Sequence, residues 1–176
     1  LSFQPAFHQA LRWSESFASP TTLRMRVPLG RAGERVRFTF RAGDGSFELQ
    51  RATVARAGAD GELASEPLPL TFGGAPGFSA GFRQRVTSDP VELPVTFREE
   101  LFVTFVVEGQ VAASAVELFA DGCEAAGDHA DATGPFGQPQ LKAMGLATVE
   151  VEAEKSRVFV AMGDSITEGY VEGKDE

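Results

Sequence analysis

Apolar and polar residues alternate along much of the chain, as they do in strands with one buried face. Residues 23–27 place Leu, Met and Val on one face and two arginines on the other. Residues 36–41 repeat this arrangement, and the segment Gly30-Arg31-Ala32-Gly33 between them predicts a turn. The first twenty residues have no clear alternation and are expected to form an extended opening segment.

The same pattern continues toward the middle of the chain. Turns are predicted at 43–45 and 58–61, strands at 47–57 and 67–72, and a Gly/Pro-rich loop at 73–81. Proline interrupts residues 90–95, which predicts an edge strand, because proline cannot donate a hydrogen bond to a neighbouring strand.

The next segment, residues 100–107, is almost wholly apolar and predicts a central strand covered on both faces. Further strands are expected at 116–120 and 146–152, separated by a long surface loop at 121–140 that is rich in Gly, Ala, Asp and Pro. Many short strands punctuated by turns predict a mainly β fold, an antiparallel β-sandwich of jelly-roll type over residues 1–155.

The character of the chain changes after a short charged hinge at 154–156. The apolar run 158–162 is typical of a strand buried in a parallel sheet. It leads directly into Gly163-Asp164-Ser165-Ile166-Thr167. Gly163 permits a tight strand-to-helix turn, and Ser165 would lie at the carboxyl end of the strand, where the first N–H groups of a helix favour a developing oxyanion.

This block, with the apolar strand before it, resembles the first motif of the GDSL/SGNH serine hydrolases. The resemblance implies that Ser165 is the nucleophile and that Gly163 and Asp164 form the supporting turn and oxyanion region. It also implies a flavodoxin-like α/β domain, of which residues 156–176 are the opening strand and helix start. Some bacterial members carry an N-terminal β-sandwich domain, as expected here. Neither a cofactor nor a metal is expected.

The resemblance also implies groups that this sequence lacks. Members of the family supply a Gly and an Asn to the oxyanion hole, and an Asp-x-x-His near the C-terminus. Eleven residues follow Ser165 and none is a histidine, while His8 and His129 precede it without an aspartate three positions earlier. A serine without a base is a weak nucleophile. We therefore expect the base, with the rest of the SGNH domain, to come from polypeptide outside these 176 residues. A second chain produced by cleavage in the polar segment 171–176 would supply it.

The expected activity is hydrolysis of small acyl esters through a Ser165 acyl-enzyme, with acetyl esters of carbohydrate as the first candidate substrate by analogy. One alternative is a non-catalytic module that binds carbohydrate or protein. Carbohydrate platforms normally display Trp or Tyr, and the chain has one of each. A second alternative is a purely structural β domain.

The net charge and the composition disfavour some classes of binding partner. A net charge of −9 disfavours nucleic acid and anionic membranes, and no apolar run is long enough to span a membrane. Cys123 is the only cysteine, so no internal disulfide or Cys cluster forms. For the cellular location, the sequence slightly favours an exported or periplasmic protein over a cytoplasmic one.

The two histidines have two interpretations each, and three other polar residues have one. His129, between Asp128 and Asp131, fits either a metal site or, more commonly, a solvated loop. Asp44 and Asp60 are expected to form turns, and Cys123 to be an unreactive loop thiol. His8 lies near Phe3, Phe7 and Trp13, a set that fits a small ligand-facing patch or the packing of the opening segment onto a sheet.

Overall fold

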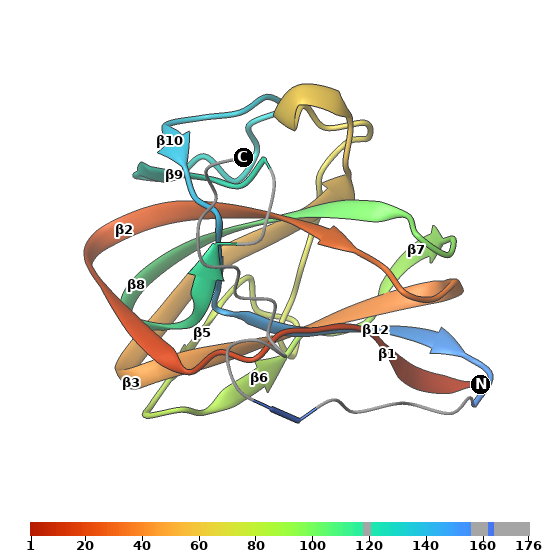
Figure 1. The fold of residues 1–176 in the computed structure, drawn as a ribbon, viewed down its shortest axis with the longest axis horizontal. Helices are drawn as coiled ribbons and strands as arrows, with labels where there is room; N and C mark the ends of the chain where they lie inside the picture. The colour runs from red at the N-terminus through yellow and green to blue at the C-terminus, as the bar shows by residue number, and fades with distance from the viewer. Residues whose placement is uncertain (118–120, 156–161, 164–176) are drawn as a thin grey trace.

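The computed structural model describes residues 1–117, 121–155 and 162–163, and in these ranges the fold is mainly β. The described strands form one curled antiparallel sheet (Figure 1). Its strand order is β1 (Ser2–His8), β12 (Leu146–Ala153), β3 (Gly33–Arg56), β8 (Glu100–Glu117), β2 (Trp13–Pro28), β9 (Cys123–Ala126) and β10 (Gln138–Pro139). The mainly β, antiparallel prediction is confirmed.

Shorter elements lie along this path. Four short strands pair with β3: β4 (Leu68–Pro69), β5 (Phe78–Ala80), β6 (Arg85–Thr87) and β7 (Val91–Val95). A fifth, β11 (Lys142–Met144), pairs with β8. The helical element of the described ranges is a single 3₁₀ turn, η1 (Ala59–Gly61), at the turn predicted for 58–61. No helix in the described ranges is long and apolar enough to cross a membrane.

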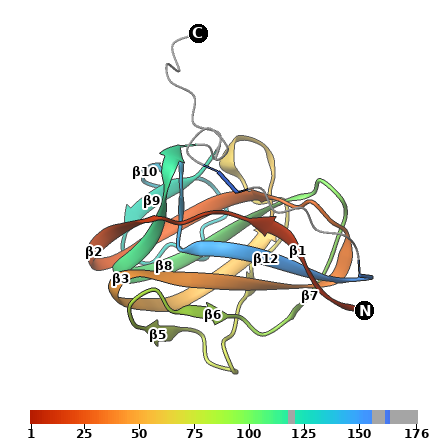
Figure 2. The same ribbon diagram turned by 60° about the horizontal axis from the view of Figure 1, so that its bottom comes forward.

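The long strand β3 belongs to both halves of the sheet. Its first half pairs with β12, and its second half pairs with β8. Figure 2 shows β1, β12 and β3 running side by side. The register with β8 skips between Ala42 and Phe47, and the sheet curls at this point.

The turn predicted at 43–45 is therefore wrong, because β3 continues through it. A Cβ on Gly43 would lie 2.2 Å from the Ser14 Oγ atom, and one on Gly45 would lie 2.8 Å from Gln110 Cγ. These glycines allow neighbouring strands to approach closely at a bend, which is the other common use of glycine inside a strand.

The apolar core lies between the two halves of the sheet. The Phe40 ring of β3 meets the Phe105 ring of β8 edge to face at a centroid distance of 5.2 Å. Phe72 and Phe78 extend this cluster, with their centroids 4.7 Å apart. Phe has no polar tip that needs a hydrogen-bond partner, which suits these rings to the core of a curled sheet.

Two strand predictions are confirmed and one loop prediction is wrong. β8 lies between β3 and β2 and is buried from Leu101 to Val107, as expected of a central strand. β7 pairs with β3 alone within the described ranges, as expected of an edge strand. The predicted surface loop 121–140, however, contains β9 and β10. β9 pairs with the edge of β2 that is not occupied by β8, and β10 pairs with β9.

The opening segment is more ordered than expected. It forms β1 and the first part of β2, whose register with β8 skips between Phe17 and Thr21. The strand predicted at 116–120 is the end of β8 as far as Glu117, and residues 118–120 lie outside the described ranges. Of the predicted second domain, Met162 and Gly163 are described, and both are exposed.

The core predicts a clear contrast between two phenylalanines. Phe40→Ala is expected to lower the free energy of unfolding by about 3–5 kcal/mol, because it leaves a cavity among buried rings. Phe97→Ala is the matched control, since that ring is 61% exposed and its loss is expected to cost about 0.5 kcal/mol or less. Urea unfolding measures both, and similar losses for the two variants would contradict this position of the core.

Candidate functional site

The residues of the predicted nucleophile motif lie at the margin of the structure. Gly163 is exposed, while Asp164 and Ser165 lie outside the described residues, as does most of the apolar run before them.

Both histidines are engaged within the β fold. His8 Nδ1 lies 3.0 Å from the Thr148 Oγ1 atom, and burial, followed by repulsion from Arg85, lowers the pKa of His8. The Nε2 atom of His129 lies 3.0 Å from the Ala126 carbonyl oxygen, which can only accept, so Nε2 carries the proton. Of the two interpretations of His8, packing onto the sheet fits this contact.

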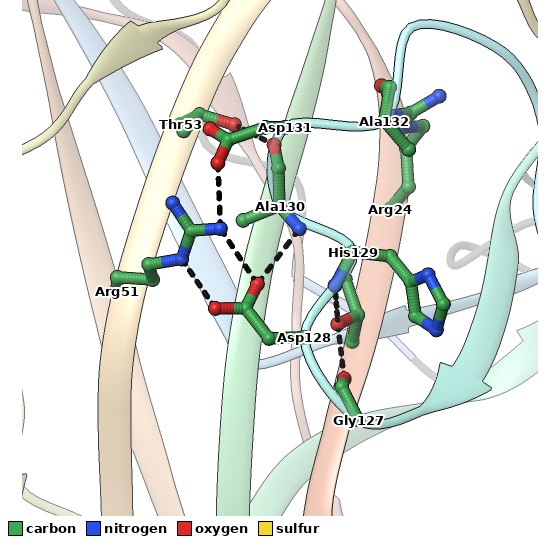
Figure 3. A network of polar contacts seen from close by, with 10 residues as sticks. Arg24, Arg51, Thr53, Gly127, Asp128, His129, Ala130, Asp131 and Ala132 are labelled. Carbon is green, nitrogen blue, oxygen red and sulfur yellow. Dashed lines mark hydrogen bonds and ion pairs between the residues drawn. The ribbon is translucent and has the colours of Figure 1, made fainter.

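The aspartates beside His129 bind an arginine. Arg51, on β3, donates from Nε to Asp128 Oδ2 at 2.6 Å and from Nη2 to Asp131 Oδ2 at 2.7 Å (Figure 3). Within the described ranges, no group of three or more His, Cys, Asp or Glu residues is placed to hold a metal ion. The His129 ring instead stacks on Phe136 at a centroid distance of 5.4 Å.

Threonines from β3 and β2, the strands on either side of β8, bind the same segment. Thr53 of β3 donates to the Ala130 carbonyl oxygen at 2.8 Å. Thr22 of β2 donates to the Gly127 carbonyl oxygen at 2.6 Å and accepts from the His129 backbone N–H at 2.9 Å. Segment 127–134 is thus fastened to the outward face of the sheet (Figure 3).

Arg24 of β2 completes this attachment from a fully buried position. Its Nε donates to Thr104 Oγ1 at 2.9 Å, its Nη1 to the Gly134 carbonyl oxygen at 2.8 Å, and its Nη2 to the Ala132 carbonyl oxygen. Burial lowers the pKa of Arg24, but arginine stays protonated in proteins, so the charge is retained. Charge-assisted hydrogen bonds to carbonyl oxygens offset its desolvation.

Sequence reasoning missed Arg24, because alternation assigns it to an outward, solvated face. The missing signal was in the segment that covers it. The side chains of Gly, Ala, Pro and ionised Asp donate no hydrogen bond, and Pro also lacks a backbone N–H, so the carbonyls of such a stretch need donors from the sheet when they are buried.

A hollow of about 510 Å³ lies beside this attachment, between η1 and residues 121–123 and 135–141. Asp60 and Asp121 line it, both with left-handed backbone (φ of 51° and 54°), a conformation that aspartate tolerates better than most residues. Asp121 pairs with Arg26 at 2.8 Å, and the ring of Phe136 forms part of the wall. Asp60 is a turn residue, as predicted.

The predictions for Asp44 and Cys123 have different outcomes. Asp44 lies within β3, not in a turn, and its Oδ1 atom accepts from Arg83 Nε at 2.7 Å. Cys123 lies in β9, not in a loop, and burial raises the pKa of its thiol. A thiol with a raised pKa is a poor nucleophile at neutral pH, in line with the unreactive cysteine expected.

Two more hollows, of about 360 and 460 Å³, share the side chains of Phe17 and Glu124. The Glu124 carboxylate accepts from Gln138 Nε2 at 2.6 Å and from Gln140 Nε2 at 2.7 Å. Lys142 pairs with Glu15 at 3.0 Å in the same region. The region therefore combines an aromatic ring with amides and carboxylates. Hydrogen bonds between Glu124 and the two glutamines, and the ion pair of Lys142 with Glu15, orient these polar groups.

No protein-family model matches the chain, and no curated protein matches it.

The Arg51–Asp128 pair predicts a pH dependence of stability. The hydrogen bond from Arg51 is the main reason why the pKa of Asp128 lies below its ordinary value of 3.8. A carboxylate with a lowered folded-state pKa stabilises the protein above its unfolded pKa, and this contribution is lost as the pH falls through the folded value. The free energy of unfolding of the wild type is therefore expected to exceed that of Asp128→Asn near neutral pH. The difference should be about 1 kcal/mol or less, because the ion pair is half exposed.

The difference should shrink toward zero as the pH falls below about 3.8. Urea unfolding of both proteins between about pH 7 and pH 2.5 measures it. A difference that is constant with pH, or that grows on acidification, would count against the pair as described.

Proposed function

We propose that the chain carries the nucleophile of a GDSL/SGNH-type serine esterase, with residues 1–155 as its N-terminal β domain. The observation that carries this proposal is the block Gly163-Asp164-Ser165-Ile166-Thr167 directly after an apolar run of strand type. A glycine before and a polar residue beside the serine suit a nucleophile presented on a tight turn, whereas a bare serine carries no such information.

The surroundings of the motif support this assignment. The last described strand ends at Ala153, and Glu154 and Lys155 are exposed, as expected of a hinge between two units.

In the proposed reaction, Ser165 Oγ attacks the acyl carbon of a small ester, with acetylated carbohydrate as the candidate substrate. An imidazole takes the hydroxyl proton and returns it to the departing alcohol, leaving an acyl-enzyme. Water then attacks the acyl carbon and gives a proton to the same base; the bond from the acyl carbon to Ser165 Oγ breaks, the base returns the proton to that oxygen, and the acid leaves. The Ser165 N–H helps to hold the oxyanion in both steps.

The imidazole is proposed to come from polypeptide outside residues 1–176. His8 and His129 each have a ring nitrogen bonded within the β fold, to a threonine hydroxyl and a backbone carbonyl oxygen respectively. Among the residues that the structure describes, no carboxylate bonds to either ring in the way that orients a catalytic histidine. The remaining SGNH segment, as a continuation or a docked second chain, is the proposed partner.

We further propose that the curled sheet is a jelly-roll type sandwich. The passage of β3 from one half to the other and the aromatic core between the halves support this topology. In this arrangement the β domain positions the substrate or shapes the mouth of the site.

A fluorophosphonate probe tests the esterase assignment on the protein that contains the remaining SGNH polypeptide. Labelling is expected on Ser165 and is expected to vanish in Ser165→Ala, together with hydrolysis of p-nitrophenyl acetate. Ser46→Ala is the matched control, because Ser46 is exposed on β3, and it should label normally. Labelling that persists in Ser165→Ala would overturn the proposal.

A further inference from the structure

Three hollows adjoin one another around residues 137–141. The largest shares Gly137 and Gln138 with one neighbour and Pro139 and Leu141 with the other, and these two neighbours share Phe17 and Glu124. Each volume, from about 360 to about 510 Å³, lies within the range of about 300–1,000 Å³ that ligand sites occupy. We propose that these hollows form a binding furrow for a neutral oligosaccharide.

The chemistry of the furrow favours a polyol. Glu124 holds the amides of Gln138 and Gln140 through one hydrogen bond to each of its oxygens, so three planar polar groups have fixed orientations. Each amide keeps a second N–H, and carboxylate oxygens have lone pairs beyond those already used. Adjacent hydroxyls of a sugar need donors and acceptors side by side, as this array provides.

Aromatic rings complete the complementarity. Phe17 lines two of the hollows and Phe136 lines the third. The C–H groups of a pyranose carry a small positive charge and pack on the negative face of an aromatic ring. The furrow therefore offers both apolar and polar contacts to a chain of sugar units, without Trp or Tyr.

Charge distinguishes a neutral sugar from other polymers. A net charge of −9 and lining carboxylates disfavour uronic acid polymers and other polyanions. Two of the lining carboxylates are paired, Glu15 with Lys142 and Asp121 with Arg26, whereas the Glu124 carboxylate is bonded to neutral amides and keeps its charge. Sugar hydroxyls can donate to this carboxylate and also accept from its amide partners, whereas the side chains of a basic peptide only donate, so the array favours a neutral polyol.

The furrow is held in place before any ligand binds. Arg24 lies beneath Phe136, with its guanidinium carbon 4.9 Å from the ring centroid, and binds the Gly134 carbonyl oxygen two residues earlier. The skipped register of β2 between Phe17 and Thr21 sets Phe17 at the edge of two hollows. A ligand therefore has little protein ordering to overcome on binding.

This site is independent of the esterase proposal, because every residue that forms it belongs to the β fold. The test uses the 176-residue protein in native gels containing xylan, mixed-linkage β-glucan or galactomannan, followed by calorimetry with the matching hexasaccharide. We expect at least one neutral polysaccharide to retard the protein, and Ser165→Ala to bind as well as wild type.

Two variants and two matched controls locate the binding. Gln138→Ala removes an exposed amide of the furrow, and Phe17→Ala removes its shared ring; each is expected to weaken hexasaccharide binding about tenfold or more. Gln50→Ala and Phe97→Ala delete exposed side chains outside the three hollows and should bind as wild type. Phe17 also packs on the core, so Phe17→Ala could unfold the protein. In that case the result for Gln138→Ala alone decides the test.

Absence of retardation by all three polysaccharides would overturn the proposal, as would binding that Gln138→Ala leaves unchanged. Binding of hexalysine in place of the sugars would assign the furrow to a basic peptide and equally reject it. Loss of fluorophosphonate labelling, by contrast, bears only on the esterase assignment.

Discussion

A charge without water has to be surrounded by hydrogen-bond acceptors, and the buried guanidinium of Arg24 imposes this constraint on the outward side of the sheet. Its hydrogen bonds go to a threonine hydroxyl and to backbone carbonyl oxygens, including that of Gly61 at 3.4 Å. These carbonyls belong to η1 and to the segment after β9. One side chain therefore joins two loops that are far apart in the sequence.

This interaction gives the sheet two different faces. The inward face is closed by phenylalanine rings, whereas the outward face carries Thr22, Arg24, Arg51 and Thr53, which fasten segment 127–134. Phe102 of β8 is fully buried on the outward side, with the guanidinium carbon of Arg26 4.7 Å from its ring centroid. The covering segment then continues into residues 135–141, around which the proposed sugar furrow lies.

Sequence reasoning reached the elements that depend on local pattern. The apolar run 100–107 predicts a central strand because apolar side chains on both faces need cover, and the prolines of 90–95 predict an edge. Gly43-Asp44-Gly45 misled because such a segment suits a turn and a bend equally well. The choice between a turn and a bend depends on Ser14 and Gln110, which are distant in the sequence and lie close to Gly43 and Gly45.

The candidate sites were predictable to different degrees. The motif at Ser165 is contiguous and can be read directly, and its role remains a prediction. The furrow and Arg24 could not be found in this way, because alternation tells which side of a strand a residue occupies but not what covers that side. Residues 121–140 looked like an exposed loop because their partners lie on β2 and β3, about a hundred residues earlier for Thr22 and Gly127.

The most direct test of this account is amide hydrogen exchange in Arg24→Met compared with Arg51→Met. If buried Arg24 holds the covering segment, amides of residues 127–134 should exchange about tenfold faster or more in Arg24→Met, since each buried carbonyl left without a donor costs about 1–3 kcal/mol. Arg51→Met, which removes a half-exposed ion pair, should have a smaller effect. Unchanged protection of 127–134 in Arg24→Met, or an effect no larger than that of Arg51→Met, would contradict the account.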